Sequence, residues 1–560
     1  MKSQRQDNFG IPPLKRDGVL HTDSQTKADI MLDEFKSVFT REDTSHLPQL
    51  GGTAYPSISG LTIHEAGVAK LLSQLDPNKA SGPDGIPCRV LKHLSSELAP
   101  IITALLRQTL DTGVLPEDWI KATISPIYKK GNIHLASNYR PISLTCVIAK
   151  IMEHILSTHI RNHLDHHKIL TPLQHGFRKV HSCESQLVIT LDDLMSAYDH
   201  KIHVDVGVLD FSRAFDTVPH ERLLVKLKHY GIDGPIHTWI RSFLCNRHMT
   251  VAIDGELSHS TQVDSGVPQG TVLGPLLFLL FINDLPAHLS PDTSVRLFAD
   301  DCLVYRHILS PDDQDILQKD LTSLEQWTNT WGMRFNPAKC TILSISRSRS
   351  HQNKLYTLCG EVLQEENEAK YLGIRISNTL DWSSHVGAVA KKGSNTLNFI
   401  RRNLKYCPKQ SKQMAYFSIV RPTLDYGAVV WDPHLKKHQE VLERVNRRAA
   451  RFVMNDYSPT SSVTAMLDTL GWPSLEHRRE YQRLVFMYKI ANGLIAVPST
   501  NLIPADSRTR AQHSFKYRTI QSSTSAYKNS FFPRTIPGWN RLPSEVVNSD
   551  TVDSFKANLS

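Results

Sequence analysis

Hydrophobic and polar positions change their period several times between residues 61 and 376, and each period predicts a different kind of element. The run from Val206 to Leu209 is short and apolar, as in a buried strand. After Pro219, apolar residues recur at helical spacing until Gly231, which predicts a helix between these two residues. Strand-like and helix-like stretches alternate in this way throughout. The pattern predicts an α/β or α+β unit.

The residues before this region differ from it in composition. The first 60 residues are polar and rich in turn-forming residues, so we expect folding to begin near Leu61. Residues 75–87, LDPNKASGPDGIP, predict a loop that a helical stretch follows. Residues 122–128 have strand character and run into a basic Lys-Lys-Gly turn. We interpret residues 1–60 as a polar leader or linker.

Basic amphipathic helices are predicted after residue 385. Residues 391–451 contain 14 Lys and Arg against 4 Asp and Glu. An excess of this size is more than solubility requires and predicts contact with a phosphate backbone. The candidate contacts are two arginines near residue 400 and four on one helical face of ERVNRRAARFV: Arg401, Arg402, Arg444, Arg447, Arg448 and Arg451.

Composition narrows the class of protein. The chain has 560 residues, so we expect two to four packed units. A net charge of +9 favours polyanionic partners. The longest strongly apolar run, Leu273–Phe281, is too short to span a bilayer, and the N-terminus lacks the apolar core of a signal peptide. We therefore expect an intracellular protein with no membrane contact.

Cysteine and histidine spacing gives no clear metal motif. The eight cysteines include no Cys-x-x-Cys pair, so we expect reduced thiols, most of them buried. His159, His163 and His166 fall at helical spacing on one face and could hold a metal. No Cys or carboxylate cluster accompanies them, and we expect a solvated helix face there instead.

Two adjacent aspartates interrupt a strand-like stretch in LFADDCLVYR. We expect Asp300 and Asp301 to lie at a tight turn between two strands, and Asp210 to end the strand at 206–209. If these elements pair in one sheet, three carboxylates meet at one edge. They cannot all stay ionised together without a cation. Two Mg²⁺ ions, with Mn²⁺ as a possible substitute, would neutralise them and serve an in-line phosphoryl displacement.

Several motifs now resemble those of a known family. LDFSRAFDTV, SGVPQGTVLGPLLFLLFINDL and FADD, in this order, resemble the palm motifs of reverse transcriptases. They are most similar to those of non-long-terminal-repeat (non-LTR, LINE-type) retrotransposons in the jockey-like branch. ASNYRPISLTCVIAKIMEHIL upstream and WGMRFNPAKCTIL downstream support the resemblance. It covers roughly residues 61–455 closely, and the combination of motifs is highly specific.

The resemblance implies roles for the acidic residues. Asp210 and Asp300 would ligate both metal ions, and Asp301 would lie at the same acidic edge. The main-chain carbonyl of Phe211 would complete the shell of one metal. Lys339, in NPAKC, matches a lysine proposed to protonate the departing pyrophosphate, although a structural lysine is an open alternative.

The resemblance also implies a nucleotide-binding set. Phe215 matches the aromatic residue that packs under the incoming sugar and excludes a 2′-hydroxyl, with ordinary core packing as the alternative. Gln269 matches the glutamine beside the nucleotide, where Gly270 lets the backbone approach closely. Arg140 and, less directly, Lys129 match residues that clamp the triphosphate, a role that suits a guanidinium fork. Asp216 is not assigned as a ligand.

The implied architecture is α+β, a right-hand polymerase with fingers, a palm built on an antiparallel sheet, a helical thumb and a C-terminal extension. We expect the fingers and palm in residues 61–377, with core motifs from about 110. The basic thumb would take residues 378–455, and residues 456–560 have no assigned role. The family's endonuclease cannot fit in residues 1–60, so we expect a truncated copy or a partial gene model.

The sequence therefore predicts an RNA-directed DNA polymerase, a nucleotidyltransferase that joins deoxynucleotides to a primer 3′-hydroxyl. Its partners would be an RNA template, a DNA primer and dNTPs, in the cytoplasm and nucleus as part of an element's ribonucleoprotein. One alternative is an inactive nucleic-acid-binding remnant of a mobile element. A less favoured one is an RNA-dependent RNA polymerase, which Phe215 argues against.

Overall fold

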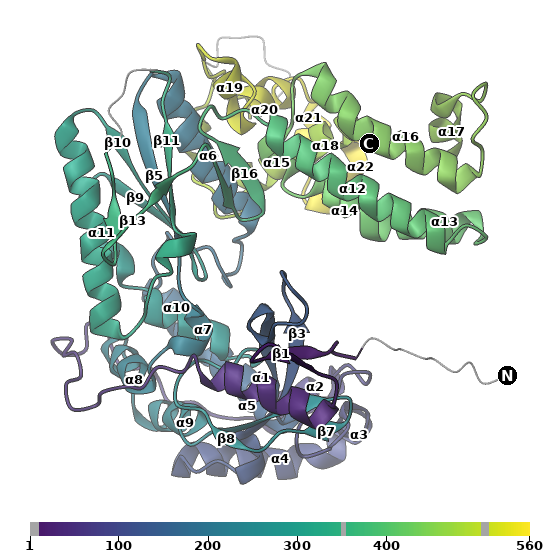
Figure 1. Ribbon diagram of the computed structural model, residues 1–560. Helices are drawn as coiled ribbons and strands as arrows, with labels where there is room; N and C mark the ends of the chain where they lie inside the picture. The colour runs from purple at the N-terminus through teal and green to yellow at the C-terminus, as the bar shows by residue number, and fades with distance from the viewer. Residues whose placement is uncertain (1–9, 349–353, 506–514, 560) are drawn as a thin grey trace. The chain divides into compact units, whose positions relative to one another are not determined.

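The computed structural model describes residues 10–348, 354–505 and 515–559 (Figure 1). The chain forms two compact units. Unit 1 takes the described residues up to Phe177 together with Phe211–Leu289 and Thr322–Asn336. Unit 2 takes Arg178–Asp210, Ser290–Leu321 and the described residues from Pro337 onward. Each unit mixes helices with a five-stranded sheet, so the expectation of a mixed α/β fold is confirmed.

Unit 1 contains a sheet of order β4-β3-β6-β7, with β8 also paired to β6. The strands of unit 1 are β1 (Leu14–Arg16), β2 (Val19–His21), β3 (Lys121–Tyr128), β4 (Tyr139–Leu144), β6 (His248–Ile253), β7 (Glu256–Leu257) and β8 (Thr261–Gln262). Strands β1 and β2 form a separate pair. Its helices are α1 (Ser24–Lys36), α2 (Glu65–Ser73), α3 (Cys88–His93), α4 (Ser95–Thr112), α5 (Val147–His166), α7 (Ala214–Thr217), α8 (His220–His229), α9 (Gly234–Leu244) and α10 (Gly274–Ile282).

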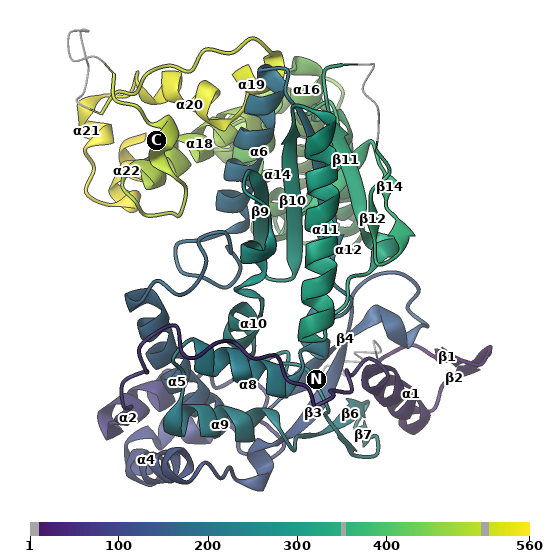
Figure 2. The same cartoon turned by 90° about the vertical axis from the view of Figure 1, so that its left-hand side faces the viewer.

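The N-terminal segment is part of unit 1, so the expectation that folding begins near Leu61 is wrong. Helix α1 begins at Ser24, where the side chain of Asp23 accepts a hydrogen bond from the Thr26 amide. Met31 and Phe35 on α1 are almost fully buried and share a core cluster with Val251 of β6. Figure 2 shows α1 beside β6 and β7. The apolar residues of α1 therefore complete the core over this sheet.

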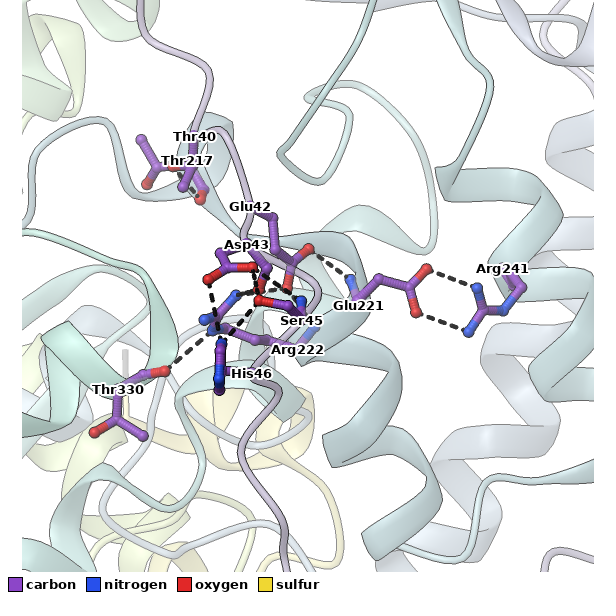
Figure 3. Close-up of polar contacts among 10 residues, drawn as sticks. All are labelled: Thr40, Glu42, Asp43, Ser45, His46, Thr217, Glu221, Arg222, Arg241 and Thr330. Atoms are coloured by element: carbon purple, nitrogen blue, oxygen red, sulfur yellow. Dashed lines mark hydrogen bonds and ion pairs between the residues drawn. The ribbon is translucent and has the colours of Figure 1, made fainter.

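A second anchor of the same segment caps helix α8. Pro219, at the N-cap position of α8, provides no side-chain hydrogen bond, and Glu42 supplies the missing acceptor. The Glu42 carboxylate accepts from the backbone amides of Glu221 and Arg222, each at 2.9 Å, and from the Arg222 guanidinium at 2.9 Å (Figure 3). Both side chains are largely buried. A carboxylate at a helix N-terminus satisfies orphan amides and complements the helix dipole.

Unit 2 contains a sheet of order β14-β11-β5-β10-β9. The strands of unit 2 are β5 (His203–Asp210), β9 (Thr293–Phe298), β10 (Asp301–Ile308), β11 (Thr341–Ile345), β12 (Thr357–Leu358), β13 (Glu361–Val362), β14 (Gln364–Glu365), β15 (Glu368–Tyr371) and β16 (Ile374–Ser377). Strands β12 and β13 form one separate pair, and β15 and β16 form another. Helix α6 (Cys183–Asp199) packs against β5 and β9 (Figure 2). Helix α11 (Pro311–Trp331) follows β10, and its last residues belong to unit 1.

The rest of unit 2 is helical. Its elements are α12 (Ser383–Asn403), α13 (Lys409–Ala415), the π-helix η5 (Tyr416–Val420), α14 (Arg421–Asp425), α15 (Ala428–Trp431), α16 (Lys436–Met454), α17 (Val463–Leu470), α18 (Leu475–Ala491), α19 (Ser525–Lys528), α20 (Phe531–Trp539), α21 (Ser544–Val547) and α22 (Val552–Leu559). Helices α12 and α16 lie side by side (Figure 1). Residues from α6, β5, α16, α18 and α22 share one apolar core. Described residues of the C-terminal region, from Met466 to Phe555, thus pack in the same core as the basic helices.

The expected solvated histidine face on α5 is confirmed for His166, which is exposed, and is wrong for His163. His163 is buried, and its Nε2 lies 2.9 Å from the Tyr230 carbonyl oxygen. Nε2 of His159 lies 2.8 Å from the carbonyl oxygen of Ser59. His159 and His163 therefore fix chain segments to α5. Within the described ranges, no helix has the length and apolar character needed to cross a membrane.

Candidate active site

Asp210 and Asp301 face each other across two strands of unit 2. Strands β10 and β5 pair antiparallel, with Asp301 opposite Asp210 and Ile308 opposite His203. Directly opposed residues have their Cβ atoms about 5 Å apart on the same face of the sheet. The expected pairing of the two acidic motifs in one sheet is confirmed.

The turn before Asp301 is a two-residue hairpin loop. Phe298 of β9 pairs with Asp301 of β10, which leaves only Ala299 and Asp300 to make the turn. Ala299 has φ +54°, a left-handed conformation that is unfavourable for a residue with a Cβ atom. The predicted hairpin is confirmed. The strained turn places Asp300 and Asp301 at the junction of β9 and β10.

Lys339 approaches Asp210 from the segment before β11. Its Nζ lies 3.0 Å from Oδ2 of Asp210, and both side chains are partly exposed. Oδ2 itself is buried, and the contact has ion-pair distance without hydrogen-bond geometry. The Asp210 amide donates to Sγ of Cys340 at 3.3 Å. The backbone of Asp210 is therefore fixed, while one carboxylate oxygen keeps unused bonding capacity.

The acidic pair has the chemistry of a partial metal site. Within the described ranges, no group of three or more His, Cys, Asp or Glu side chains is gathered as a metal cluster. The donors that are present are carboxylate oxygens, which Mg²⁺ prefers, and one of them is the buried Oδ2 of Asp210 without a hydrogen bond. Mg²⁺ usually binds through one or two carboxylates plus waters and substrate phosphates. The residues fit such an ion.

The Cys302 thiol lies next to the acidic pair in the chain. Cys302 follows Asp301 in β10 and is fully buried, and this burial raises the pKa of its thiol. Such a thiol stays protonated at neutral pH and offers no competing thiolate to a metal.

Phe211 and Phe215 follow Asp210 in the chain and lie in unit 1. The Phe211 ring is buried and stacks on Phe335, with ring centroids 4.4 Å apart. The Phe215 ring stacks on the buried Phe278 at 4.4 Å and keeps part of its surface exposed. One face of Phe215 therefore packs in the core, which leaves both of its expected roles open.

Gln269 is held from two directions. Its side-chain amide donates to Oδ1 of Asp216 at 2.8 Å, and its carbonyl oxygen accepts from the Ser143 amide of β4 at 2.7 Å. Gly270 has φ +102°, and a Cβ atom there would lie 2.9 Å from the Ser143 carbonyl oxygen. Only glycine allows this close approach of the loop to β4.

A residue that the sequence did not predict fixes the end of this loop. Glu153 of α5 is fully buried, and its Oε2 accepts from the amides of Val272 at 2.6 Å and Leu273 at 3.0 Å. Burial raises the pKa of this carboxyl, and the two amides and the charge of Arg247 oppose that rise. The only signal was one acid inside the apolar run IAKIMEHIL.

Arg140 and Lys129 lie on the β3–β4 hairpin of unit 1. Arg140 is exposed on β4 and pairs in register with Ile127, and the Lys129 amide donates to the Asn138 carbonyl oxygen at 2.9 Å. Because β4 also carries Ser143, one strand connects Arg140 to the Gln269 loop. The predicted nucleotide-binding set thus lies on neighbouring elements of unit 1.

The basic residues of α16 divide by environment. Arg444, Arg447 and Arg448 are exposed, and Arg448 donates to the Asn398 side-chain oxygen of α12 at 2.8 Å. Arg451 donates to the Ser458 carbonyl oxygen at 2.8 Å and lies within reach of two more carbonyls of the same loop. Its guanidinium is committed to shaping that loop, so it is the least available of the four for a phosphate.

Residues 127–376 match the family described as reverse transcriptase (RNA-dependent DNA polymerase). This range includes every acidic and nucleotide-binding residue that the sequence predicted. The predicted kinship with the polymerases of non-LTR retrotransposons is confirmed by the relatives.

Curated relatives extend the match beyond this domain. The RNA-directed DNA polymerase from mobile element jockey of Drosophila melanogaster is 28% identical over 409 residues, 70% of this chain and 44% of the relative. The probable RNA-directed DNA polymerase from transposon X-element of the same species is 30% identical over 398 residues, 68% of this chain and 43% of the relative. A third, from transposon BS, is 27% identical over 401 residues. The chain spans less than half the length of these relatives.

Proposed function

We propose that this protein is an RNA-directed DNA polymerase of the non-LTR retrotransposon type. The observation that carries the proposal is the direct opposition of Asp210 and Asp301 in β5 and β10, within a reverse transcriptase domain. The substrates would be an RNA template, a DNA primer and dNTPs. The reaction would be attack of the primer 3′-hydroxyl on the α-phosphate of a dNTP, with release of pyrophosphate.

The acidic residues would hold divalent cations. Asp210, Asp300, Asp301 and the Phe211 carbonyl would be the protein ligands for two Mg²⁺ ions, with Mn²⁺ as a substitute. When bound, these ions supply positive charge that stabilises an in-line phosphoryl displacement. Lys339, whose ammonium already lies beside Asp210, would donate a proton to the leaving pyrophosphate.

The residues of unit 1 would bind and orient the nucleotide. Arg140 and Lys129 would contact the triphosphate, and the loop of Gln269 and Gly270 would lie against the base pair that forms. The exposed part of Phe215 would exclude a 2′-hydroxyl. Positioning of this kind supplies much of the rate in phosphoryl transfer.

In this proposal, residues 61–377 act as fingers and palm, and residues 378–455 act as a thumb whose exposed arginines contact phosphates. The same arginines would bind nucleic acid in an inactive remnant of a mobile element. The remnant and the polymerase therefore differ only in whether nucleotides are incorporated. Binding of a primer–template without incorporation under any metal would favour the remnant. Preference for ribonucleotides over deoxynucleotides would favour an RNA polymerase.

Primer extension on a homopolymer RNA template tests the proposal. Wild-type protein should extend the primer with Mg²⁺ and stop when a chelator is added. Asp210→Ala should lower the rate at least about 10³-fold, because the charge stabilisation at the phosphate is lost. Asp43→Ala, which removes an exposed carboxylate outside this site, is the matched control. Near-wild-type extension by Asp210→Ala would refute the assignment.

A further inference from the structure

A pocket of about 420 Å³ lies in unit 2 between the end of α12 and the end of α16. Its volume falls in the range of ligand sites that take a molecule of nucleotide size. The residues that line it are Asn398, Arg401, Arg402, Lys405, Phe452, Asn455 and Tyr457, here called the α12–α16 pocket. It contains none of the residues assigned above to the metal ions or to the incoming nucleotide.

The charge of the α12–α16 pocket favours an anion. Arg401, Arg402 and Lys405 line it, and the lining includes no carboxylate. These cations follow one another at the C-terminal end of α12, where the helix dipole favours positive side chains. The pocket therefore offers a fixed cluster of donors to a phosphate group.

An aromatic ring stands beside these cations. Tyr457 is half exposed, and the guanidinium carbon of Arg401 lies 5.4 Å from its ring centroid. Hydrogen bonds hold the loop that carries Tyr457, since Arg451 donates to the Ser458 carbonyl oxygen and Asp456 accepts from the Ser458 amide at 3.0 Å. A pre-positioned ring next to arginines is the arrangement on which an unpaired base stacks.

The amides of the pocket can contact the edge of a base. Arg448 occupies the side-chain oxygen of Asn398 at 2.8 Å, and this orients the Asn398 amide nitrogen as a donor. Within the described ranges that nitrogen has no hydrogen-bond partner. Asn455 ends α16 in a left-handed conformation at φ +53°, which brings its side chain to the same pocket.

We propose that the α12–α16 pocket binds one unpaired nucleotide of a single-stranded nucleic acid, with the base stacked on Tyr457 and its phosphate on Arg402 and Lys405. The proposal deepens the proposed function, on which it rests for the class of partner. A base inside a duplex cannot reach the ring, so the pocket separates single-stranded from paired segments. Either the template RNA or a displaced DNA strand carries this chemistry.

Binding of labelled single strands to the full chain tests the pocket. Tyr457→Ala should weaken binding of short oligo(U) and oligo(dT) strands about tenfold, the loss expected for one stacked base. Binding of an RNA–DNA duplex of the same length should change less than about twofold by the same reasoning. A loss confined to oligo(U) assigns the pocket to RNA, and one confined to oligo(dT) assigns it to DNA.

Two variants control for side-chain loss. Tyr457→Phe keeps the ring and should bind as wild type does. Phe399→Ala removes an aromatic side chain that is 55% exposed on α12 and outside the pocket, and it should also bind normally. Unchanged single-strand binding by Tyr457→Ala, or an equal loss on the duplex, would overturn the proposal.

Salt dependence separates the ring from the cations. Arg402→Ala should reduce the slope of log affinity against log salt by about 0.7 on a single strand, the value for one phosphate contact. Tyr457→Ala should lower affinity at every salt concentration and leave the slope unchanged, and a slope change equal to that of Arg402→Ala would refute stacking. These assays need no turnover, so failure of the pocket and failure of the polymerase are distinguishable.

Discussion

Lys339 lies beside Asp210, with its Nζ 3.0 Å from Oδ2, at the point where Asp301 faces Asp210 across the sheet. Like charges directly opposite each other destabilise a strand pair, and the ammonium offsets part of that repulsion. The same ammonium competes with any cation that approaches Asp210. Lys339 therefore serves the acidic pair in a way that can be separated from proton donation.

Replacement of this lysine gives the first prediction. Lys339→Met should lower the Mg²⁺ concentration for half-maximal extension about twofold to fivefold, because an exposed ion pair contributes roughly 0.2–1 kcal/mol. It should also lower kcat at saturating Mg²⁺ by about 10²-fold, the least that a general acid contributes. Steady-state extension over a Mg²⁺ series measures both. An unchanged kcat would leave Lys339 with the electrostatic role alone.

The close approach of Gly270 to β4 predicts that a side chain at this position weakens dNTP binding. The cause would be the steric contact, and not the positive φ alone. Gly270→Ala places a Cβ atom 2.9 Å from the Ser143 carbonyl oxygen and should displace the Gln269 loop. The KM for dNTP should rise at least about tenfold, since a small misplacement is costly in a positioned site. Gly255→Ala is the control: its φ is +93°, yet its Cβ atom would meet nothing within 4 Å. Equal effects of the two variants on KM would contradict this account.

Removal of the Glu42 cap should destabilise unit 1. Glu42→Ala leaves the first amides of α8 without their acceptor and removes the carboxylate that pairs with the buried Arg222 guanidinium. We expect a loss of about 3 kcal/mol in the free energy of unfolding, between the cost of a lost N-cap and that of a broken buried ion pair. Urea denaturation measures it. The neighbouring Asp43→Ala, which removes an exposed carboxylate, should cost far less (Figure 3).

His385 should make unit 2 acid-sensitive. It lies between Trp382 and Trp431, and burial lowers its pKa to about 4. Because the unfolded chain binds the proton first, stability is full above pH ~6.5 and falls as the pH drops toward the folded value, by about 2 kcal/mol between pH 7 and pH 5.

A variant isolates this contribution. His385→Gln keeps an acceptor for the Arg375 amide, which donates to Nδ1 at 3.3 Å, and should lose the extra sensitivity between pH 7 and pH 5. His477→Gln, at an exposed position of α18, should retain it. Urea midpoints at the two pH values provide the comparison. Parallel midpoint shifts in all three proteins would exclude His385 as the cause.

The sequence predicted the acidic hairpin because its signals were local. Asp300 and Asp301 interrupt one strand-like stretch and Asp210 ends another, so each strand followed from local pattern. Their pairing in one sheet was only a condition of the predicted site. The roles of these residues came from motif resemblance. No local pattern announced that Asp301, rather than Asp300, would be the register partner of Asp210.

The burial of charged residues could not be predicted from the sequence, for a physical reason. Lys226 of α8 looks like a solvated lysine in LLVKLKHYG, yet it is fully buried, and its Nζ lies 3.8 Å from the centroid of the Trp331 ring. Burial lowers its pKa to about 8, and Asp284 opposes that shift. A helical pattern gives the face of a residue, whereas the partners that compensate a buried charge come from distant segments.

Helix α1 shows that the family match and the physical fold have different limits. The match starts at residue 127, inside β3, while the apolar cover of that sheet includes Met31 and Phe35. A recombinant fragment cut at the match would leave a sheet face bare to solvent and prone to aggregation. Expression vectors for this region should therefore include helix α1 as well as the matched residues.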